Sequence, residues 1–156
     1  MDLCVVDWKA ITPICAALIA SGTALYISNK WNKQKGAEVL AGEIKNSIKD
    51  ILEIIKIVHN LSKNDITSEQ YSEYFNTFKS LCESVLRSSS YIETCVEIDG
   101  FKAQMDEFFK HCYELIWGKS DVKSFSDKSK YIRMTGITLI ITLTPYSIYQ
   151  EKFKFR

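Results

Sequence analysis

The sequence predicts an all-α protein, in which an N-terminal transmembrane helix continues into a cytoplasmic antiparallel bundle of three to four helices. Three observations lead to this fold class. The segment 10–28 contains no charged residue, an apolar seam at helical spacing follows it, and further helical patterns come after that seam. At 156 residues, the chain has room for one domain beside a membrane anchor.

The predicted span, residues 10–28, reads AITPICAALIASGTALYIS. Nineteen helical residues cover roughly 28 Å, close to the hydrocarbon thickness of a bilayer. A cleaved signal peptide normally starts with a basic region, whereas the flank 1–9 is net acidic. Two alternatives stay open: cleavage near Ser21, and a buried helix of a domain that does not enter the membrane.

The flanks of this segment predict its orientation. Lys30, Lys33 and Lys35 follow the span directly, and basic residues prefer the cytoplasmic side. We therefore expect residues 1–9 outside and residues 29–156 in the cytoplasm, with the three lysines serving as topology determinants and lipid contacts. The abundance of Lys, Ile, Asn and Ser favours a bacterial or phage source, and hence the bacterial inner membrane.

Small side chains gather on one side of the predicted span. At 100° per residue, an arc of roughly 100° collects these residues and Pro13. Small residues allow helix backbones to approach closely in lipid, which favours self-association. Small residues are also tolerated in a lone anchor, or where the helix packs on another helix of the same chain. The predicted helix–helix association face consists of Ala17, Ala20, Ser21, Ala24 and Ser28.

A long helix is expected to follow the span without a break, because only Gly36 and Gly42 interrupt its pattern. Its apolar residues alternate at spacings of four and three, which is a sustained heptad seam. The seam consists of Ala37, Ala41, Ile44, Ile48, Ile51, Ile55 and Val58, and Leu40, Leu52 and Leu61 widen it.

Two shorter helices follow in the sequence pattern. Thr67 and Gln70 have the spacing of a capping box, which predicts the start of a second helix with a weak point at residues 88–90. Asp99 is the predicted N-cap of a third helix ending at Gly118. The Ser- and Lys-rich segment 119–130 is predicted to be a loop. We expect the aromatic side chains to form the core: Tyr71, Tyr74, Phe75, Phe78, Phe101, Phe108, Phe109, Tyr113 and Trp117.

The last apolar run, residues 132–149, fits three interpretations. It contains several threonines and Pro145 among Ile and Leu residues, so a final bundle helix, a short β excursion and a second membrane segment all remain open. A second crossing would place the basic tail EKFKFR outside, against the preference of basic residues for the cytoplasmic side.

No motif predicts a catalytic, cofactor or metal site, so we expect no enzyme and no cofactor. His111, with Glu107 and Cys112 near it, lacks the second pair of ligands that a metal site needs. Cys82, Cys95 and Cys112 are expected to be reduced core residues. The net charge of +1 argues against nucleic acid as a partner.

In its layout, the chain resembles small membrane proteins of bacterial phage-defence and toxin systems, including pore-forming accessory proteins of some RNA-targeting CRISPR systems. This resemblance covers architecture only, since no motif identifies a family. It implies an oligomeric membrane protein that forms a pore or perturbs the membrane. The alternatives are a membrane-tethered module that recruits a cytoplasmic protein partner, and an immunity-type regulator of another membrane protein.

Overall fold

A computed structural model describes residues 8–62, 66–118 and 122–155, and the side chains of all of these except residues 8–12 and 122–124. The described residues form four helices and one short antiparallel ribbon, which confirms the all-helical prediction. In chain order, the elements are α1 (Trp8–Leu61), α2 (Ser68–Cys95), β1 (Val96–Glu97), α3 (Phe101–Trp117), α4 (Val122–Ser147) and β2 (Lys154–Phe155).

Helix α1 is continuous over 54 residues, as the uninterrupted pattern predicted. The chain divides into two compact units, Met1–Glu38 and Val39–Arg156. Within the described residues, no helix combines the length and the apolar character needed to cross a membrane. The predicted span begins at residue 10, among side chains that are not described, and most of the flank 1–9 also lies outside the described residues.

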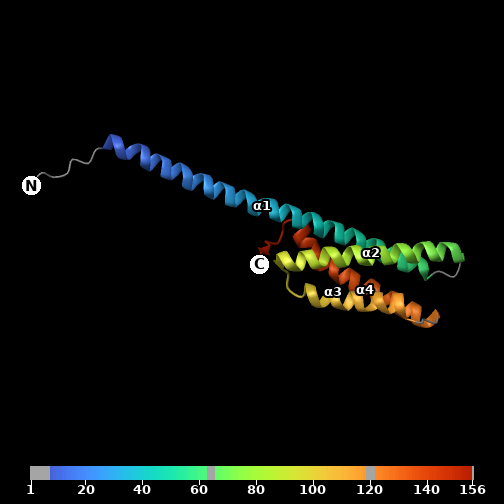
Figure 1. Ribbon diagram of the computed structural model, residues 1–156. Helices are drawn as coiled ribbons and strands as arrows, with labels where there is room; N and C mark the ends of the chain where they lie inside the picture. The colour runs from blue at the N-terminus through green and yellow to red at the C-terminus, as the bar shows by residue number, and fades with distance from the viewer. Residues whose placement is uncertain (1–7, 63–65, 119–121, 156) are drawn as a thin grey trace, which may run out of the picture. The chain divides into compact units, whose positions relative to one another are not determined.

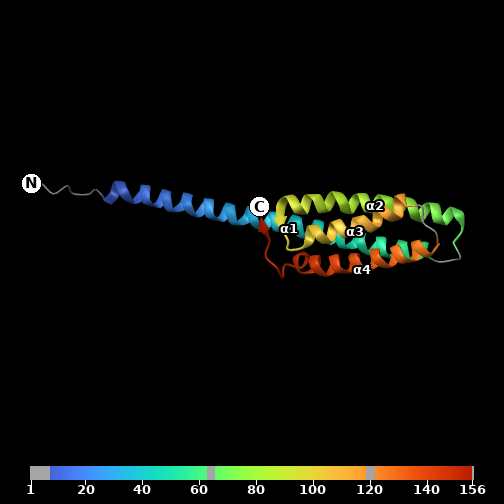
Figure 2. The ribbon, with the colours of Figure 1, turned by 90° about the horizontal axis from the view of Figure 1, so that it is seen from below.

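The second unit is a bundle in which α2, α3, α4 and the part of α1 from Val39 onwards run antiparallel to their neighbours in sequence (Figures 1 and 2). The heptad seam of α1 supplies one side of the core, because Ile44, Ile51 and Val58 are fully buried. Phe78 of α2 and Phe108 of α3 are equally buried. Leu52, expected to widen the seam, is instead exposed, because its position on α1 is turned away from the other helices.

Helix α4 corrects the prediction of a loop at residues 119–130, since the helix begins at Val122. Of the three interpretations of residues 132–149, the structure shows a bundle helix up to Ser147, with Ile132, Leu139 and Leu143 fully buried. Gly136 allows this helix to approach the others closely. A Cβ at Gly136 would lie 3.0 Å from Ile55 and 3.2 Å from Phe108.

Two of the three predicted helix ends, at Thr67 and Gly118, are confirmed by the structure. Thr67 and Gln70 form the predicted capping box, with both reciprocal hydrogen bonds at 3.2 Å. Helix α2 then runs through residues 88–90 without the predicted weak point. Asp99 is not the cap of α3, because Gly100 occupies that position with a φ of 74°, which favours glycine. Gly118 ends α3, as predicted.

The ribbon ties the C-terminal tail to the bundle. Val96 pairs with Phe155 and Glu97 with Lys154, directly after the end of α2. The Phe153 ring also packs on Tyr146 of α4, with ring centroids 5.7 Å apart. The described tail is therefore held at the C-terminal end of α4.

The expectation that the aromatic side chains form the core is only partly right. Phe78, Phe101, Phe108 and Phe109 are buried, and Tyr74 and Phe75 are half-buried. Tyr71, Tyr113 and Trp117 are exposed, because they lie on the outward sides of α2 and α3, and the Trp117 ring is 80% exposed.

Candidate association face and surface grooves

The N-terminal part of α1 has no described side chain packed over it. Every residue from Pro13 to Lys35 is exposed, although Pro13–Ser28 contains no charged side chain. The exposed fraction of its large apolar residues lies between 59% and 70%. These residues are Ile14, Leu18, Ile19, Leu25, Tyr26, Ile27 and Trp31.

The predicted association face lies within this stretch, and all five of its residues are exposed on one continuous helix: Ala17, Ala20, Ser21, Ala24 and Ser28. Gly22 is open too, since a Cβ there would meet nothing within 4 Å. The nearby Thr23 hydroxyl donates a hydrogen bond of 2.8 Å to the Ile19 carbonyl oxygen. The polar group of Thr23 is therefore satisfied inside its own helix.

The three lysines predicted to set topology are exposed on the same helix. Lys35 lies 3.7 Å from the Glu38 carboxylate, and its ammonium group lies 5.7 Å from the Trp31 ring centroid. Lys30 and Lys33 are exposed without a salt bridge within 4.0 Å to any described residue. This end of the stretch thus combines an aromatic ring with positive charge.

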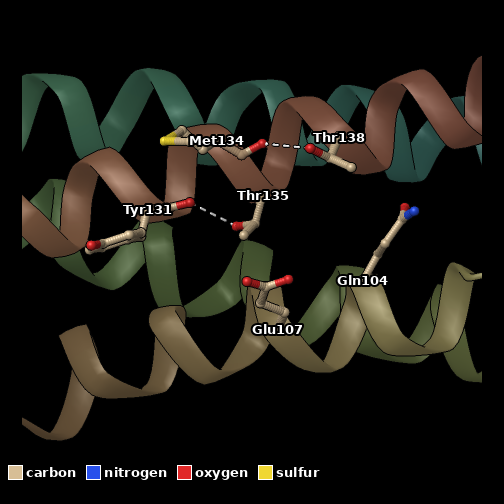
Figure 3. Close-up of a pocket in the computed structure, with 6 residues that line it drawn as sticks. All are labelled: Gln104, Glu107, Tyr131, Met134, Thr135 and Thr138. Atoms are coloured by element: carbon tan, nitrogen blue, oxygen red, sulfur yellow. Dashed lines mark hydrogen bonds between the residues drawn. The ribbon is translucent and has the colours of Figure 1, made fainter.

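A groove of about 240 Å³ lies between α3 and α4 (Figure 3). Glu107 and Gln104 point from α3 towards α4, where Thr135 faces them. The Thr135 hydroxyl donates to the Tyr131 carbonyl oxygen at 2.9 Å, so it is already satisfied. Among the described residues lining the groove, Glu107 and Tyr131 are the titratable groups, which is too few for an acid–base pair of carboxylates.

A second groove, of about 230 Å³, lies between α2 and α3. Lys79, Glu83 and Trp117 line its outer part, and Cys82 lies at its floor, where the side chain is only 3% exposed. Cys82 interacts with the thiol of Cys112, which is fully buried on α3. Burial raises the pKa of Cys112 well above its ordinary value, and the Cys82 thiol raises it further. The Cys112 thiol is therefore protonated at neutral pH.

His111 does not bring potential metal ligands together. Its ring stacks on Tyr131 at 5.1 Å, and its Nδ1 lies 3.5 Å from a Glu114 carboxylate oxygen. Glu107 turns into the groove, and Cys112 turns into the core. Within the described part of the chain, no group of three His, Cys, Asp or Glu side chains could hold a metal ion.

The groove between α3 and α4 was missed from the sequence. Three of its α4 residues, Met134, Thr135 and Thr138, lie in the apolar run whose structure was left open, and Tyr131 directly precedes that run. The recurrence of Thr135, Thr138 and Thr142 at spacings of three and four was the available signal of a helical polar edge. Thr142 donates a hydrogen bond of 2.8 Å to the Gln104 side-chain oxygen, which joins the two helices at this edge.

Comparison of this chain with protein-family models, with curated proteins and with solved structures finds no match.

Proposed function

We propose that this protein is anchored in a membrane by residues 10–28 and assembles there into a homo-oligomer through the small-residue face of α1. The helical bundle lies on the cytoplasmic side and controls the assembly. An assembly of ring size would form a pore or perturb the membrane. The lysines at positions 30, 33 and 35 hold the cytoplasmic end of the span at the lipid headgroups.

The observation that carries this proposal is the exposure of an uncharged apolar helix. Ile14, Leu18 and Leu25 are each more than 60% exposed on a stretch that contains no charge up to Ser28. Folded proteins rarely expose a contiguous apolar surface to water, and such a surface usually marks a site of contact with another protein or with a membrane. Burial of an Ile or Leu side chain contributes about 1.5–3 kcal/mol, so lipid or a neighbouring copy stabilises this stretch strongly.

The polar groups of the stretch suit an apolar environment. An unsatisfied hydroxyl costs free energy in hydrocarbon, and the Thr23 hydroxyl avoids that cost by bonding to Ile19. The small side chains at Ala17, Ser21 and Ala24 leave the helix backbone accessible to a second helix. These features favour association of spans over a lone anchor.

The first experiment measures the mass of the detergent-extracted protein by light scattering, with a correction for bound detergent. A discrete oligomer supports the proposal, and conductance and dye-leakage measurements then test for a pore. A monomer contradicts the proposed assembly. It would favour a tethered module whose bundle recruits a cytoplasmic partner.

Substitutions on α1 test which face associates. Ala17→Leu, Ser21→Leu and Ala24→Leu together increase the apolar character of the span but block close approach of the backbones. We expect the oligomer to dissociate while the protein stays in the membrane fraction. The matched control exchanges Ile19→Leu and Tyr26→Phe on the opposite face, which should leave the mass unchanged. Equal loss in both variants would contradict association through the small face.

A further inference from the structure

Helix α4 exposes a second apolar surface, separate from the stretch on α1. Met134, Ile137 and Ile141 fall within an arc of about 60° on the helix, and Tyr131 adjoins them. Ile148 and Tyr149 extend this surface past the end of the helix. The exposed fractions of these six residues lie between 49% and 67%. We call them the outer face of α4.

Within α4, no charged residue interrupts this surface, whereas Glu107 of α3 lines a groove with two of its residues, Tyr131 and Met134. Charges gather at both ends of the surface. Residues 134–150 are uncharged, whereas Lys130 and Arg133 precede them and Glu151, Lys152 and Lys154 follow them, so that each end keeps an excess of basic residues. All four basic side chains are exposed. The packing of Phe153 on Tyr146 and the pairing of Lys154 with Glu97 keep the second pair of cations at the end of α4.

The charge of the whole chain is unevenly distributed. Residues 122–156 carry seven basic and two acidic side chains, whereas residues 1–121 carry 13 basic and 17 acidic side chains. The net charge of +1 therefore conceals a positive C-terminal segment of +5 and a remainder of −4. The outer face of α4 lies within the positive segment.

Tyr149 occupies an unusual backbone conformation at the C-terminal end of this face. Its φ of 59° lies in the left-handed region, which glycine normally fills at a helix end. The Gln150 N–H closes the turn with a hydrogen bond of 2.9 Å to the Pro145 carbonyl oxygen. The Tyr149 ring is more than half exposed, so packing within the described chain does not explain a tyrosine at this position.

We propose that the outer face of α4 docks on an anionic lipid surface. The apolar residues enter the boundary between headgroups and acyl chains, and Tyr131 and Tyr149 lie at headgroup level. The basic residues at both ends contact the lipid phosphates. This contact goes beyond the proposed anchoring and association of α1 and does not depend on them.

Charge complementarity favours lipid over a second copy of the chain. Both ends of the outer face are basic, so a side-by-side dimer through this face places like charges together in either orientation. An anionic surface is attracted to both ends instead. Each basic residue near such a surface increases binding by about fivefold.

Photocrosslinking in the full-length protein tests the contact directly. Benzoylphenylalanine replaces Ile141 on the outer face, Lys102 on α3 as a surface control, and Leu18 on α1, each in a separate variant. The proteins are reconstituted into vesicles of phosphatidylcholine alone or with phosphatidylglycerol, irradiated and analysed by mass spectrometry. We expect a lipid adduct at residue 141 several times more abundant in the anionic vesicles, and almost none at residue 102.

The outcomes separate this inference from the proposed function. An adduct at residue 18 without one at residue 141 overturns the docking of α4 and leaves the proposed function intact. An adduct at residue 141 without one at residue 18 contradicts the anchoring by α1 and leaves the docking of α4 intact. A crosslinked dimer through residue 141 overturns the inference in favour of a second copy. Equal adducts in neutral and anionic vesicles overturn the role of the basic residues.

Two further variants test the parts of the surface. Lys152→Gln with Lys154→Gln should lower the adduct at residue 141 by about fivefold for each charge, whereas Lys110→Gln on α3 should leave it unchanged. Tyr149→Gly should lower the adduct and raise the stability of the bundle, because glycine relieves the left-handed conformation. A loss of stability in this variant would contradict our account of Tyr149.

Discussion

The Ser84 hydroxyl of α2 donates a hydrogen bond of 2.8 Å to the Asp50 carboxylate of α1. One turn further along α2, Ser88 donates to the Glu43 carboxylate at 3.3 Å. These two bonds run along the contact between antiparallel helices, and both are partly buried. They fix the alignment of α1 and α2 along their axes, which apolar packing alone does not specify.

Ser84→Ala should lower the free energy of unfolding by about 1–2 kcal/mol, because hydrogen bonds to charged groups are stronger than neutral ones. The partial exposure of the site keeps the loss below that of a fully buried pair. Ser88→Ala is the matched control, and its longer bond predicts a loss of about 0.5 kcal/mol. Urea unfolding followed by circular dichroism measures both. A larger loss in Ser88→Ala would contradict this ranking.

These serines also show why part of the bundle could be predicted and part could not. The heptad seam predicted the buried side of α1, because burial of Ile44, Ile51 and Val58 depends only on helical spacing. The serines at 88–90 suggested a weak point, since serine competes locally for backbone hydrogen bonds. In the folded chain, Ser88 bonds to another helix instead. That partner lies 45 residues away and is invisible to local patterns.

Helix α4 was misassigned for a related reason. Its first turns are rich in Ser and Lys, which favour a loop when considered alone. Tertiary packing overrides this preference, because Ser129 is buried and Phe125 packs against the core. The outer face of α4 remained hidden, since residues three and four apart share a face only in a helix, and the structure of residues 132–149 had been left open. For α1, by contrast, the predicted small-residue face needed only an uninterrupted helix.

Substitution of Ser47 by alanine should change the free energy of unfolding in the opposite direction to Ser84→Ala. The Ser47 hydroxyl is buried on α1 and has no hydrogen-bond partner among the described residues. A buried unsatisfied polar group costs about 1–3 kcal/mol, so Ser47→Ala should raise the free energy of unfolding by about 1 kcal/mol or more. Ser89→Ala is the control, because the buried Ser89 hydroxyl bonds to the Leu86 carbonyl oxygen at 2.9 Å. A loss of stability in Ser47→Ala would mean that its hydroxyl has a partner.

Gly136 and Gly42 give a second matched pair within helices. Alanine normally stabilises a helix interior by about 1 kcal/mol relative to glycine, and a Cβ at Gly42 would meet nothing within 4 Å. At Gly136, the Cβ would lie 3.2 Å from the branched Ile51 side chain and from the Phe108 ring. Overpacking of this kind costs about 1–3 kcal/mol. We expect Gly42→Ala to stabilise and Gly136→Ala to destabilise the bundle in thermal unfolding. Equal stabilisation by both would show that α4 moves away from α1 at little cost.

The buried Cys112 thiol predicts a loss of stability in alkaline solution. Burial raises the pKa of Cys112 well above its ordinary value of 9.0. Above that value, the thiol of the unfolded chain loses its proton while the folded thiol keeps it. Ionisation therefore stabilises the unfolded state and not the folded state. The stability contribution is therefore complete below pH 9.0 and decreases as the pH rises towards the folded pKa.

The decrease amounts to about 1.4 kcal/mol for each pH unit between the two pKa values. Urea unfolding at about pH 8 and about pH 10 measures the decrease in the free energy of unfolding, to which other groups that titrate in alkaline solution also contribute. Cys112→Ala should be less stable at both values because it leaves a cavity, but its pH dependence should be weaker than that of the unmodified chain. Cys15→Ala removes an exposed thiol and should keep the full dependence. Parallel curves for the unmodified chain and Cys112→Ala would show that the folded Cys112 thiol ionises as readily as the unfolded one, and that its burial contributes nothing to the alkaline response.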